Sequence, residues 1–563
     1  MNRVCWSFFL LMTFLIPLGA QAPQTIFTNG RFYTVNPKQP WAEAVAVRDG
    51  RITAVGKAAE VMAAKGEKTR VVDLGGQFVM PGFVEGHAHL RGLGESQLNL
   101  KLNEARNWDE IVAMVAKAAA EAPAGQWIIG RGWHQEKWDK QPAQTERGFP
   151  THDLLSKAAP NHPVWLDHAS GHAGIANAKA MELAGVTDKT ADPEGGEILH
   201  DGAGKVTGVF NETAAGLIVA AYQKHLDALT PEARAKRLRR ALRLAMMECL
   251  SKGITSFQDA GVDWETLDQL RSFADESKLG LRLWLMALGS PADLRKRLPA
   301  YKDLRQAGGG FLTLGGIKAY SDGALGSRGA WLLKPYSDDP TTSGHNVTDL
   351  DVLAEIADVA LEHKLQLCVH AIGDRGNREV LDLFARKLKG RDLRWRIEHA
   401  QHLNPQDIPR FAELKIIASM QGVHCTSDAP FVVKRLGEQR AREGAYVWRS
   451  LWQSGAVVSN GTDAPVEDVS PLASLQSTVT RLTRAGETFF PEQVLRREQA
   501  IQSYTLNAAF AAFEDQDKGS LEVGKFADMV VLDQDLTKVP GEKIGATRVL
   551  KTIVAGMTRY RAP

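Results

Sequence analysis

The stretch Val79-Met80-Pro81-Gly82-Phe83-Val84-Glu85-Gly86-His87-Ala88-His89-Leu90 decides how the rest of the chain is interpreted. It is apolar like a buried strand and ends in two histidines separated by one residue. On a strand, side chains at positions i and i+2 point to the same face. Two imidazoles on one face form half of a metal site, since imidazole suits zinc and its first-row neighbours. The alternative is a polar pair at a strand end, and further ligands along the chain must decide.

Length, charge and cysteine content narrow the function classes. The 563 residues favour one large domain with accessory parts. The formal net charge is +2 and no long basic run occurs, so nothing predicts binding to nucleic acid or to an anionic membrane. Cys5 lies in the N-terminal leader, and the remaining Cys249, Cys368 and Cys425 are too widely spaced for a disulfide framework.

The N-terminus has the pattern of a secretory signal peptide. Arg3 precedes the apolar run 8–18, and Gly19-Ala20-Gln21-Ala22 follows it. The run is short for a membrane span, and no other stretch is long and apolar enough for one. We predict a signal peptide over residues 1–22, cleaved after Ala22 or Ala20, and an exported protein, periplasmic or secreted. An uncleaved N-terminal anchor is the alternative.

Both ends of the mature chain are rich in short strands. Residues 24–74 contain short runs rich in Val and Ile with the turn signals Asn29-Gly30 and Asp49-Gly50 between them. The stretch 519–554 likewise contains short apolar runs that predict strands. We therefore expect segments 23–78 and 506–563 to form a composite small β domain, a β-sandwich built from both termini.

Between these ends, apolar strands alternate with amphipathic helices, which is typical of a parallel α/β domain. After the opening strand, further strands are predicted over 253–259, 281–287, 312–320, 365–370, 394–399, 415–420 and 456–462. Eight strand–helix units predict a (β/α)8 TIM barrel over 79–505, with its active site at the C-terminal ends of the strands. The last helix before the final strand is predicted over 442–453.

The connection after the first strand is too long for a structureless loop. It contains helix-like pieces, such as 108–122 and 176–184. We predict that about 95–228 forms an inserted subdomain over the barrel mouth.

Four of the predicted strands end in a residue type that can ligate a metal. Lys318 lies on the fourth strand, His370 on the fifth and His399 on the sixth, and Asp463 follows the eighth. A single histidine at a strand end is more often structural. Four such ends in register with the opening His-X-His pair are hard to ascribe to chance, and the barrel hypothesis brings them together.

This ordered set resembles the amidohydrolase superfamily, in particular its YtcJ-like branch, amidohydrolase family 3, which includes N-substituted formamide deformylases. The similarity extends over nearly all of the mature chain. It rests on the segments 81–89, 171–177, 322–328, 370–377, 396–402, 461–465 and 519–528. The opening motif alone is a weak signal, whereas the ordered set is a strong one.

The resemblance implies one or two divalent metal ions, zinc first, with manganese, iron or cobalt as alternatives. The implied ligands are His87, His89, Lys318, His370, His399 and Asp463. Lys318 would be carboxylated and bridge two metals. An ammonium cannot ligate a cation, whereas a carbamate on the same nitrogen is a negatively charged oxygen ligand. The alternative for Lys318 is a solvated lysine or one paired with Asp322.

The activity implied is hydrolysis of a carbon–nitrogen bond other than a peptide bond, in linear amides such as N-substituted formamides or N-acyl compounds. A divalent ion lowers the pKa of bound water from about 15.7 toward 7. Asp463 would act as general base and then as general acid. The expected partner is a small-molecule amide, and a homodimer is a candidate assembly.

Other functions stay open on the same barrel. A deaminase is less favoured, because deaminase branches place a glutamate where Gly373 stands and dispense with the lysine. A lactonase or phosphotriesterase shares the metal ligands. A different class is a non-catalytic secreted metal-binding regulatory protein, against which the filled ligand positions argue.

His172 and Arg328 each have a functional and a structural interpretation. His172, in the predicted insertion, is a candidate catalytic residue that contacts substrate or oxyanion, or a structural histidine. Arg328 could meet a substrate carboxylate, or pair with Asp322 or Asp338. Asp322 itself is a further candidate for substrate binding.

Trp133 and Trp138 could form an aromatic pocket wall, or pack in the core of the insertion. His402, three residues after His399, is a candidate substrate contact that is expected to lie beyond the metal ligands. Cys368 is interpreted as a packing residue, because no second feature supports cysteine catalysis.

Overall fold

The structure is a computed structural model that describes residues 21–102, 105–135, 138–168, 173–193, 196–326 and 328–563. Most of the predicted signal peptide and the candidate catalytic residue His172 lie outside the described residues. Within them, no helix is long and apolar enough to cross a membrane.

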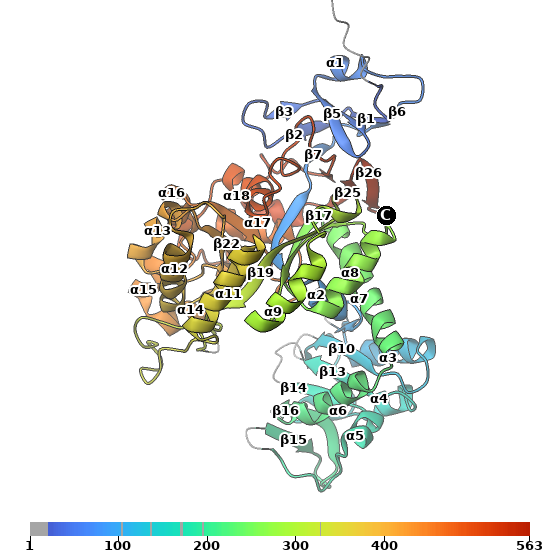
Figure 1. The fold of residues 1–563 in the computed structure, drawn as a ribbon. Coiled ribbons are helices and arrows are strands. Elements are labelled where there is room, and N and C mark those ends of the chain that lie inside the picture. Colours follow the sequence, from blue (N-terminus) through green and yellow to red (C-terminus); the bar gives the residue numbers. More distant parts are fainter. Residues whose placement is uncertain (1–20, 103–104, 136–137, 169–172, 194–195, 327) are drawn as a thin grey trace, which may run out of the picture.

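Eight parallel strands form a nearly closed barrel, which confirms the predicted α/β barrel fold. In spatial order the strands are β8 (Phe83–Ala88), β17 (Ile254–Val262), β18 (Arg282–Ala287), β19 (Leu312–Tyr320), β20 (Gln366–Ala371), β21 (Arg396–His399), β22 (Ile417–Gln421) and β23 (Val458–Gly461). All neighbouring pairs in this order are parallel. Helices surround the strands in Figure 1.

The first and last barrel strands meet through the backbone at their C-terminal ends. The N–H of Asp463 donates to the carbonyl of His87 at 2.7 Å, and the N–H of His89 donates to the carbonyl of Ala464 at 2.8 Å. These bonds place the residues that follow β23 directly beside the His-X-His pair.

Burial on both faces explains the composition of the barrel strands. Every residue of β8, β18 and β21 is buried, as expected for parallel strands with a packed interior and a helical outer layer. The outer helices are amphipathic. In α11 (Leu350–His363) the buried residues are Leu353, Ile356, Ala357, Val359 and Ala360, which form one stripe at helical spacing.

The opening stretch forms two strands, and Gly82 separates them. β7 (Phe78–Pro81) belongs to a different sheet from β8. A Cβ atom at Gly82 would lie 2.1 Å from the side chain of Thr255, so only glycine allows the chain to pass from one sheet to the other at this point. The prediction of a single strand was therefore wrong, although its C-terminal half is the first barrel strand.

Strands from both ends of the chain share one six-stranded sheet. Its order is β26 (Met557–Arg561), β25 (Val549–Val554), β24 (Met529–Leu532), β7, β2 (Arg31–Tyr33) and β3 (Trp41–Ala42). A second sheet has the order β5 (Arg51–Gly56), β4 (Ala44–Arg48), β1 (Thr25–Thr28) and β6 (Arg70–Asp73). The limits of a terminal domain and its sandwich architecture stay predictions.

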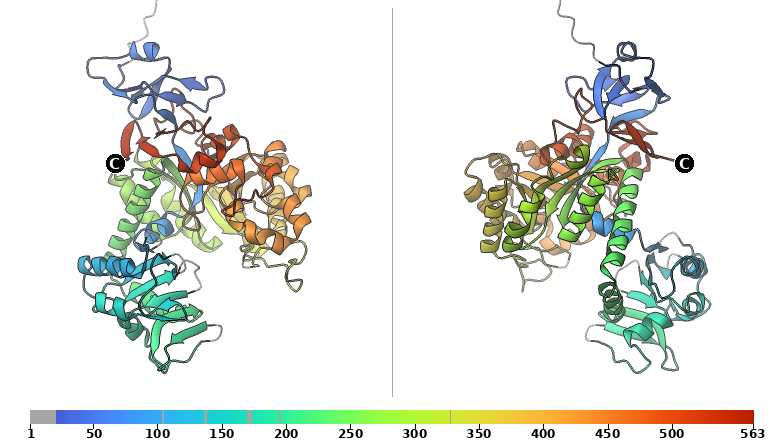
Figure 2. Two further views of the ribbon diagram at one scale, coloured as in Figure 1. Left: turned by 180° about the vertical axis from the view of Figure 1, so that it is seen from behind. Right: turned by 45° about the vertical axis from the view of Figure 1, so that its right-hand side comes forward.

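A further six-stranded sheet lies in sequence between β8 and β17. Its order is β15 (Gly196–His200), β16 (Val206–Glu212), β14 (Ala173–Ala176), β13 (Val164–His168), β10 (Ile128–Trp133) and β9 (Leu100–Lys101). Figures 1 and 2 show this group beyond one end of the long helix α7 (Pro231–Ser251). That it forms a subdomain over the barrel mouth stays a prediction.

Two helical segments differ from the sequence prediction. The helix predicted over 442–453 is two helices, α15 (Glu438–Gly444) and α16 (Trp448–Gln453). Between them Tyr446 has φ +53°, and its N–H donates to the carbonyl of Gln401 at 2.8 Å. The first helix has already ended at Gly444, where Ala445 turns to an extended backbone, and this tertiary bond holds the left-handed residue between the two helices. Helix α14 (His424–Leu436) was not predicted.

Candidate active site

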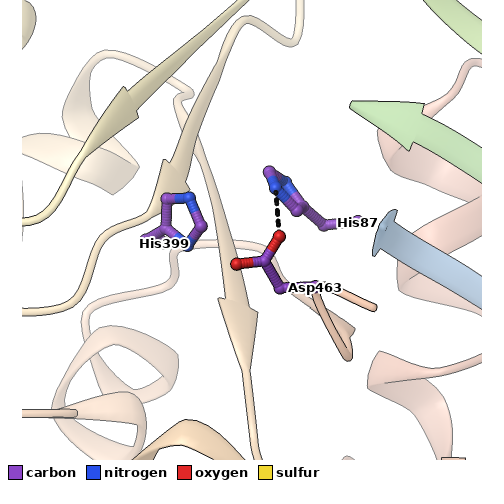
Figure 3. Close-up of side chains that lie close together, drawn as sticks. All are labelled: His87, His399 and Asp463. Carbon is purple, nitrogen blue, oxygen red and sulfur yellow. Dashed lines mark ion pairs between the residues drawn. The ribbon is translucent and has the colours of Figure 1, made fainter. Parts of the chain in front are cut away.

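The predicted metal ligands lie at the C-terminal ends of five barrel strands. They are His87 on β8, His89 directly after β8, Lys318 on β19, His370 on β20, His399 at the end of β21 and Asp463 two residues after β23. His87, His399 and Asp463 are buried, and one ligand atom from each lies within 4.8 Å of the others. Figure 3 shows these three side chains directed toward one another.

Asp463 is the acidic centre of this group. Its Oδ1 lies 3.1 Å from Nε2 of His89 and 3.5 Å from Nε2 of His87. Burial favours the neutral acid, but the neighbouring histidines outweigh burial and hold the pKa of Asp463 well below its usual range. The carboxylate is therefore ionised at neutral pH and available to a cation.

His399 joins the group through a local change in backbone conformation. Its φ is +73°, so the strand alternation ends at this residue. Its Nδ1 is hydrogen-bonded to Oε1 of Gln421 at 2.8 Å. Burial, with the neighbouring His370 and His87, holds the pKa of His399 well below its usual range. The ring is thus neutral, which is the form that ligates metals.

His370 lies beside His399, with 4.4 Å between the ring centroids. Burial, together with the charge of Lys318, lowers the pKa of His370 to about 3. Its Nε2 lies 3.7 Å from Oδ1 of Asp322. His370 is therefore also a neutral imidazole at physiological pH.

Asp322 organises the loops that follow β19 and β20. Its carboxylate accepts hydrogen bonds from the backbone N–H groups of Ile372, Gly373 and Trp331 at 2.9, 2.7 and 2.8 Å. Burial raises its pKa to about 7, although these bonds act in the opposite direction. Both oxygens accept from the backbone, so the side chain supports these loops, and a contact with substrate stays a prediction.

Lys318 is buried, and its Nζ lies 5.0 Å from the centroid of the Tyr320 ring. Burial lowers its pKa, although the carboxylates of Glu398 and Asp463 act in the opposite direction. A lowered pKa increases the share of neutral amine. Carboxylation of this amine stays a prediction.

Three supporting residues were not predicted. Glu398 is hydrogen-bonded to Nδ1 of His87, and Arg396 is paired with Glu398 at 2.7 Å. Glu85 accepts from the N–H of Thr462 at 2.7 Å, and burial raises its pKa to about 8. Glu398 stood within the motif 396–402, but the strand alternation gave no reason to place it beside His87.

His424 is a further unpredicted member of the site. It is the first residue of α14, three residues after β22. Its Nε2 lies 3.9 Å from Oδ2 of Asp463. Its ring is nearly parallel to that of His399, at 6.3 Å between centroids and 12°. It lies four residues beyond the strand predicted over 415–420, too far to count as part of that strand end, and was therefore not predicted.

Two further candidates make contacts within the protein. Arg328 is paired with Asp338 at 3.0 Å, and Asp338 also binds Arg435. A contact of Arg328 with a substrate carboxylate stays a prediction. Trp133 is 0 % exposed and its indole N–H donates to the carbonyl of Leu166 at 2.9 Å. It packs in a core cluster with Trp108 and Trp138, which leaves no face for a pocket wall.

His402 is also buried, at 2 % exposure. Within the described part of the chain neither of its ring nitrogens has a hydrogen-bond partner. Burial alone lowers its pKa to about 3. A contact with substrate stays a prediction for this residue.

The side chains at the centre fit a divalent metal ion. Nε2 of His87 and Nε2 of His370 are buried, and neither has a hydrogen-bond partner among the residues that the structure describes. Buried polar atoms are ordinarily satisfied, so these nitrogens are suited to a ligand. Neutral imidazoles beside an ionised carboxylate form the donor set of zinc and related ions.

Comparisons with known proteins agree with this geometry. A model of the amidohydrolase family matches residues 70–560. The chain is 33% identical to Protein LONG AFTER FAR-RED 3 of Arabidopsis thaliana, over 100% of this chain and 95% of that protein. It is 30% identical to the YtcJ protein of Bacillus subtilis (strain 168), over 95% and 99%. It is 29% identical to N-substituted formamide deformylase of Arthrobacter pascens, over 96% and 99%.

A solved structure is similar along most of the chain. It is an uncharacterized metal-dependent hydrolase from Pyrococcus furiosus, with 28% sequence identity and a TM-score of 0.73. The match covers 91% of this chain and 100% of that one.

Proposed function

The chain belongs to the amidohydrolase family, and from this premise and the geometry of the site we propose that it is a metal-dependent hydrolase of carbon–nitrogen bonds other than peptide bonds. The observation that carries the proposal is the convergence of His87, His399 and Asp463 within 4.8 Å at the C-terminal end of the barrel. This is where barrel enzymes place their active sites.

The proposed cofactor is one or two divalent ions, with zinc as the first candidate. His87, His89 and Asp463 would hold one ion, and His370 and His399 the other. When bound, such an ion activates water and polarises the scissile carbonyl group. Neutral rings and an ionised carboxylate support this assignment.

Lys318 would bridge the two positions as a carbamate. The neutral amine is the form that attacks carbon dioxide, giving the N-carboxylate and releasing one proton. Burial lowers the pKa of this lysine and so favours the reacting form. The product carries a negative charge that two bound cations would stabilise.

Asp463 would move the proton in the reaction. Its carboxylate takes a proton from the attacking water and returns it to the leaving nitrogen, so that the amine departs neutral. Nε2 of His424 lies 3.9 Å from Oδ2 of Asp463, the oxygen that does not face His87 and His89. This nitrogen is buried and has no hydrogen-bond partner among the described residues. We assign it as the donor to the carbonyl oxygen as negative charge develops there.

The proposed substrates are small linear amides, with N-substituted formamides as the first class. The similarity to N-substituted formamide deformylase supports this choice.

We further propose that residues 1–22 direct export. We also propose that the terminal sheets form one domain, and that the sheet between β8 and β17 belongs to a subdomain near the barrel mouth.

The test combines metal analysis with a substrate panel. Purified full-length protein is expected to contain at least one metal per chain and to hydrolyse N-substituted formamides or N-acyl amines in a metal-dependent way. The panel includes lactones, phosphotriesters and aminopurines as competing classes. Metal content without turnover of any class would favour a non-catalytic metal-binding protein, and absence of metal would overturn the proposal.

A further inference from the structure

The imidazole of His87 is hydrogen-bonded to a buried carboxylate on the side opposite Asp463. Its Nδ1 is hydrogen-bonded to Oε2 of Glu398, and both side chains are 0 % exposed. A carboxylate can only accept when ionised, so the ring donates Nδ1–H. The lone pair of His87 therefore lies on Nε2, which faces Asp463.

Glu398 in turn is fixed by Arg396. The guanidinium Nε lies 2.7 Å from Oε1 of Glu398 in an ion pair, and Nη2–H donates a hydrogen bond to Oε2 at 3.1 Å. Arg396 is also fully buried. Two buried charges are tolerated when they are paired, and the pairing with Arg396 holds the carboxylate of Glu398 beside His87.

Arg396 extends the support to three further strands. Its Nη2 donates to the carbonyl of Gly86 at 2.8 Å and to Oγ of Ser419 at 3.1 Å. Its Nη1 donates to Oε1 of Gln258 at 2.5 Å. One guanidinium thus connects β8, β17, β21 and β22, and it holds the backbone directly before His87 as well as the acceptor behind its ring.

His399 has a different support. Its Nδ1 is hydrogen-bonded to the amide oxygen of Gln421 at 2.8 Å. A neutral amide is a weaker acceptor than a carboxylate. A carboxylate behind a histidine orients the ring and raises its basicity as a ligand, and loss of such a partner typically costs about 10–100-fold in metal affinity.

We propose that Arg396 and Glu398 act as positioning residues for His87, and that they make the His87 side of the centre the tighter metal position. The inference rests on the proposed metal-dependent function. It assigns a role to two buried charged residues that take no part in the proposed proton transfer.

The experiment is a zinc titration of the full-length protein after removal of metal by a chelator, with a chromophoric chelator as competitor. Glu398→Gln is expected to weaken the first zinc equivalent by about 10–100-fold. Gln421→Ala is expected to affect this first equivalent less. Asp528→Asn is the matched control, since Asp528 forms a buried ion pair with Arg282 away from the site, at 2.6 Å.

Thermal unfolding separates positioning from general stability. Glu398→Gln and Asp528→Asn both leave a buried arginine unpaired and should both lower the unfolding temperature, but only the first should weaken zinc binding. If Glu398→Gln does not fold, Arg396→Met/Glu398→Gln removes both charges and is expected to show the same weakened binding.

Two outcomes overturn the proposal. A folded variant that lacks Glu398 and binds the first zinc equivalent with wild-type affinity removes the positioning role. If Asp528→Asn weakens zinc binding as much as Glu398→Gln does, the weaker binding results from lost stability and not from lost positioning of His87. These results leave the proposed function standing, whereas a wild-type chain that binds no zinc would overturn the proposed function together with this inference.

Discussion

Nε2 of His424 lies 3.9 Å from Oδ2 of Asp463, whereas His87 and His89 approach the other oxygen of the same carboxylate. The two oxygens of Asp463 therefore face different groups. Oδ1 lies on the side of the predicted metal ligands, and Oδ2 lies toward a histidine from α14. This division suits a carboxylate that both ligates a cation and exchanges a proton with a reacting group.

His424→Asn tests the donor role of that histidine. We expect kcat to fall about 10²–10³-fold, the typical cost of losing one donor to a developing oxyanion, while metal content stays unchanged. Steady-state kinetics and elemental analysis of the same preparation provide the measurement. The control is His363→Asn at the C-terminal residue of α11, and this variant should behave as wild type. Loss of metal from the His424 variant would instead identify this residue as a ligand.

Asp463→Asn tests the proton transfer. The amide keeps an oxygen for the cation but cannot accept and return a proton, so we expect metal to be retained and turnover to fall about 10²–10⁴-fold. Asp468→Asn, an exposed position whose carboxylate pairs with Lys252, is the control. Undiminished turnover in the Asp463 variant would remove this residue from the proton transfer.

Asp322→Ala is expected to destabilise the fold. The change removes the acceptor of the backbone N–H groups of Ile372, Gly373 and Trp331, and an unsatisfied buried donor costs about 1–3 kcal/mol. We expect a loss of roughly 3 kcal/mol or more in the free energy of unfolding, measured by urea denaturation. Asp339→Ala, which removes an exposed acceptor for Thr341 in the same loop, should cost much less. Comparable losses would contradict the supporting role of Asp322.

The barrel and its order of ligands could be predicted because both depend on short-range patterns. Strands buried on two faces appear as continuous apolar runs, as in β18. The C-terminal ends of such strands meet at one end of a barrel. The positions of Lys318, His370 and His399 along the sequence were therefore enough to place them at the same end of the barrel.

The supporting residues could not be predicted, because their positions depend on backbone details that no periodicity reveals. Alternation along β21 would send Glu398 and His399 to opposite faces. Positive φ values at His399 and Ala400, +73° and +42°, end the alternation, so that both side chains reach His87. Likewise, His424 approaches Asp463 from a helix that the sequence pattern did not indicate.

His402→Leu tests whether a buried imidazole contributes to acid unfolding. Burial lowers the pKa of His402 to about 3 in the folded protein, whereas an unfolded histidine has a pKa of about 6.5. Between these values the unfolded state binds more protons. The free energy of unfolding therefore rises with pH in this window, and stability is lost as pH falls from about 6.5 toward 3.

Leucine cannot bind a proton, so the variant should lose less stability in acid. We expect the loss between pH 6.5 and pH 4.5 to be smaller than in wild type by roughly 2 kcal/mol, since one pKa unit corresponds to about 1.4 kcal/mol. Urea denaturation at a series of pH values measures this, with His363→Leu as a control at a partly exposed position. An unchanged dependence on pH would mean that His402 is protonated without opening the fold, for example through access to water from the active site.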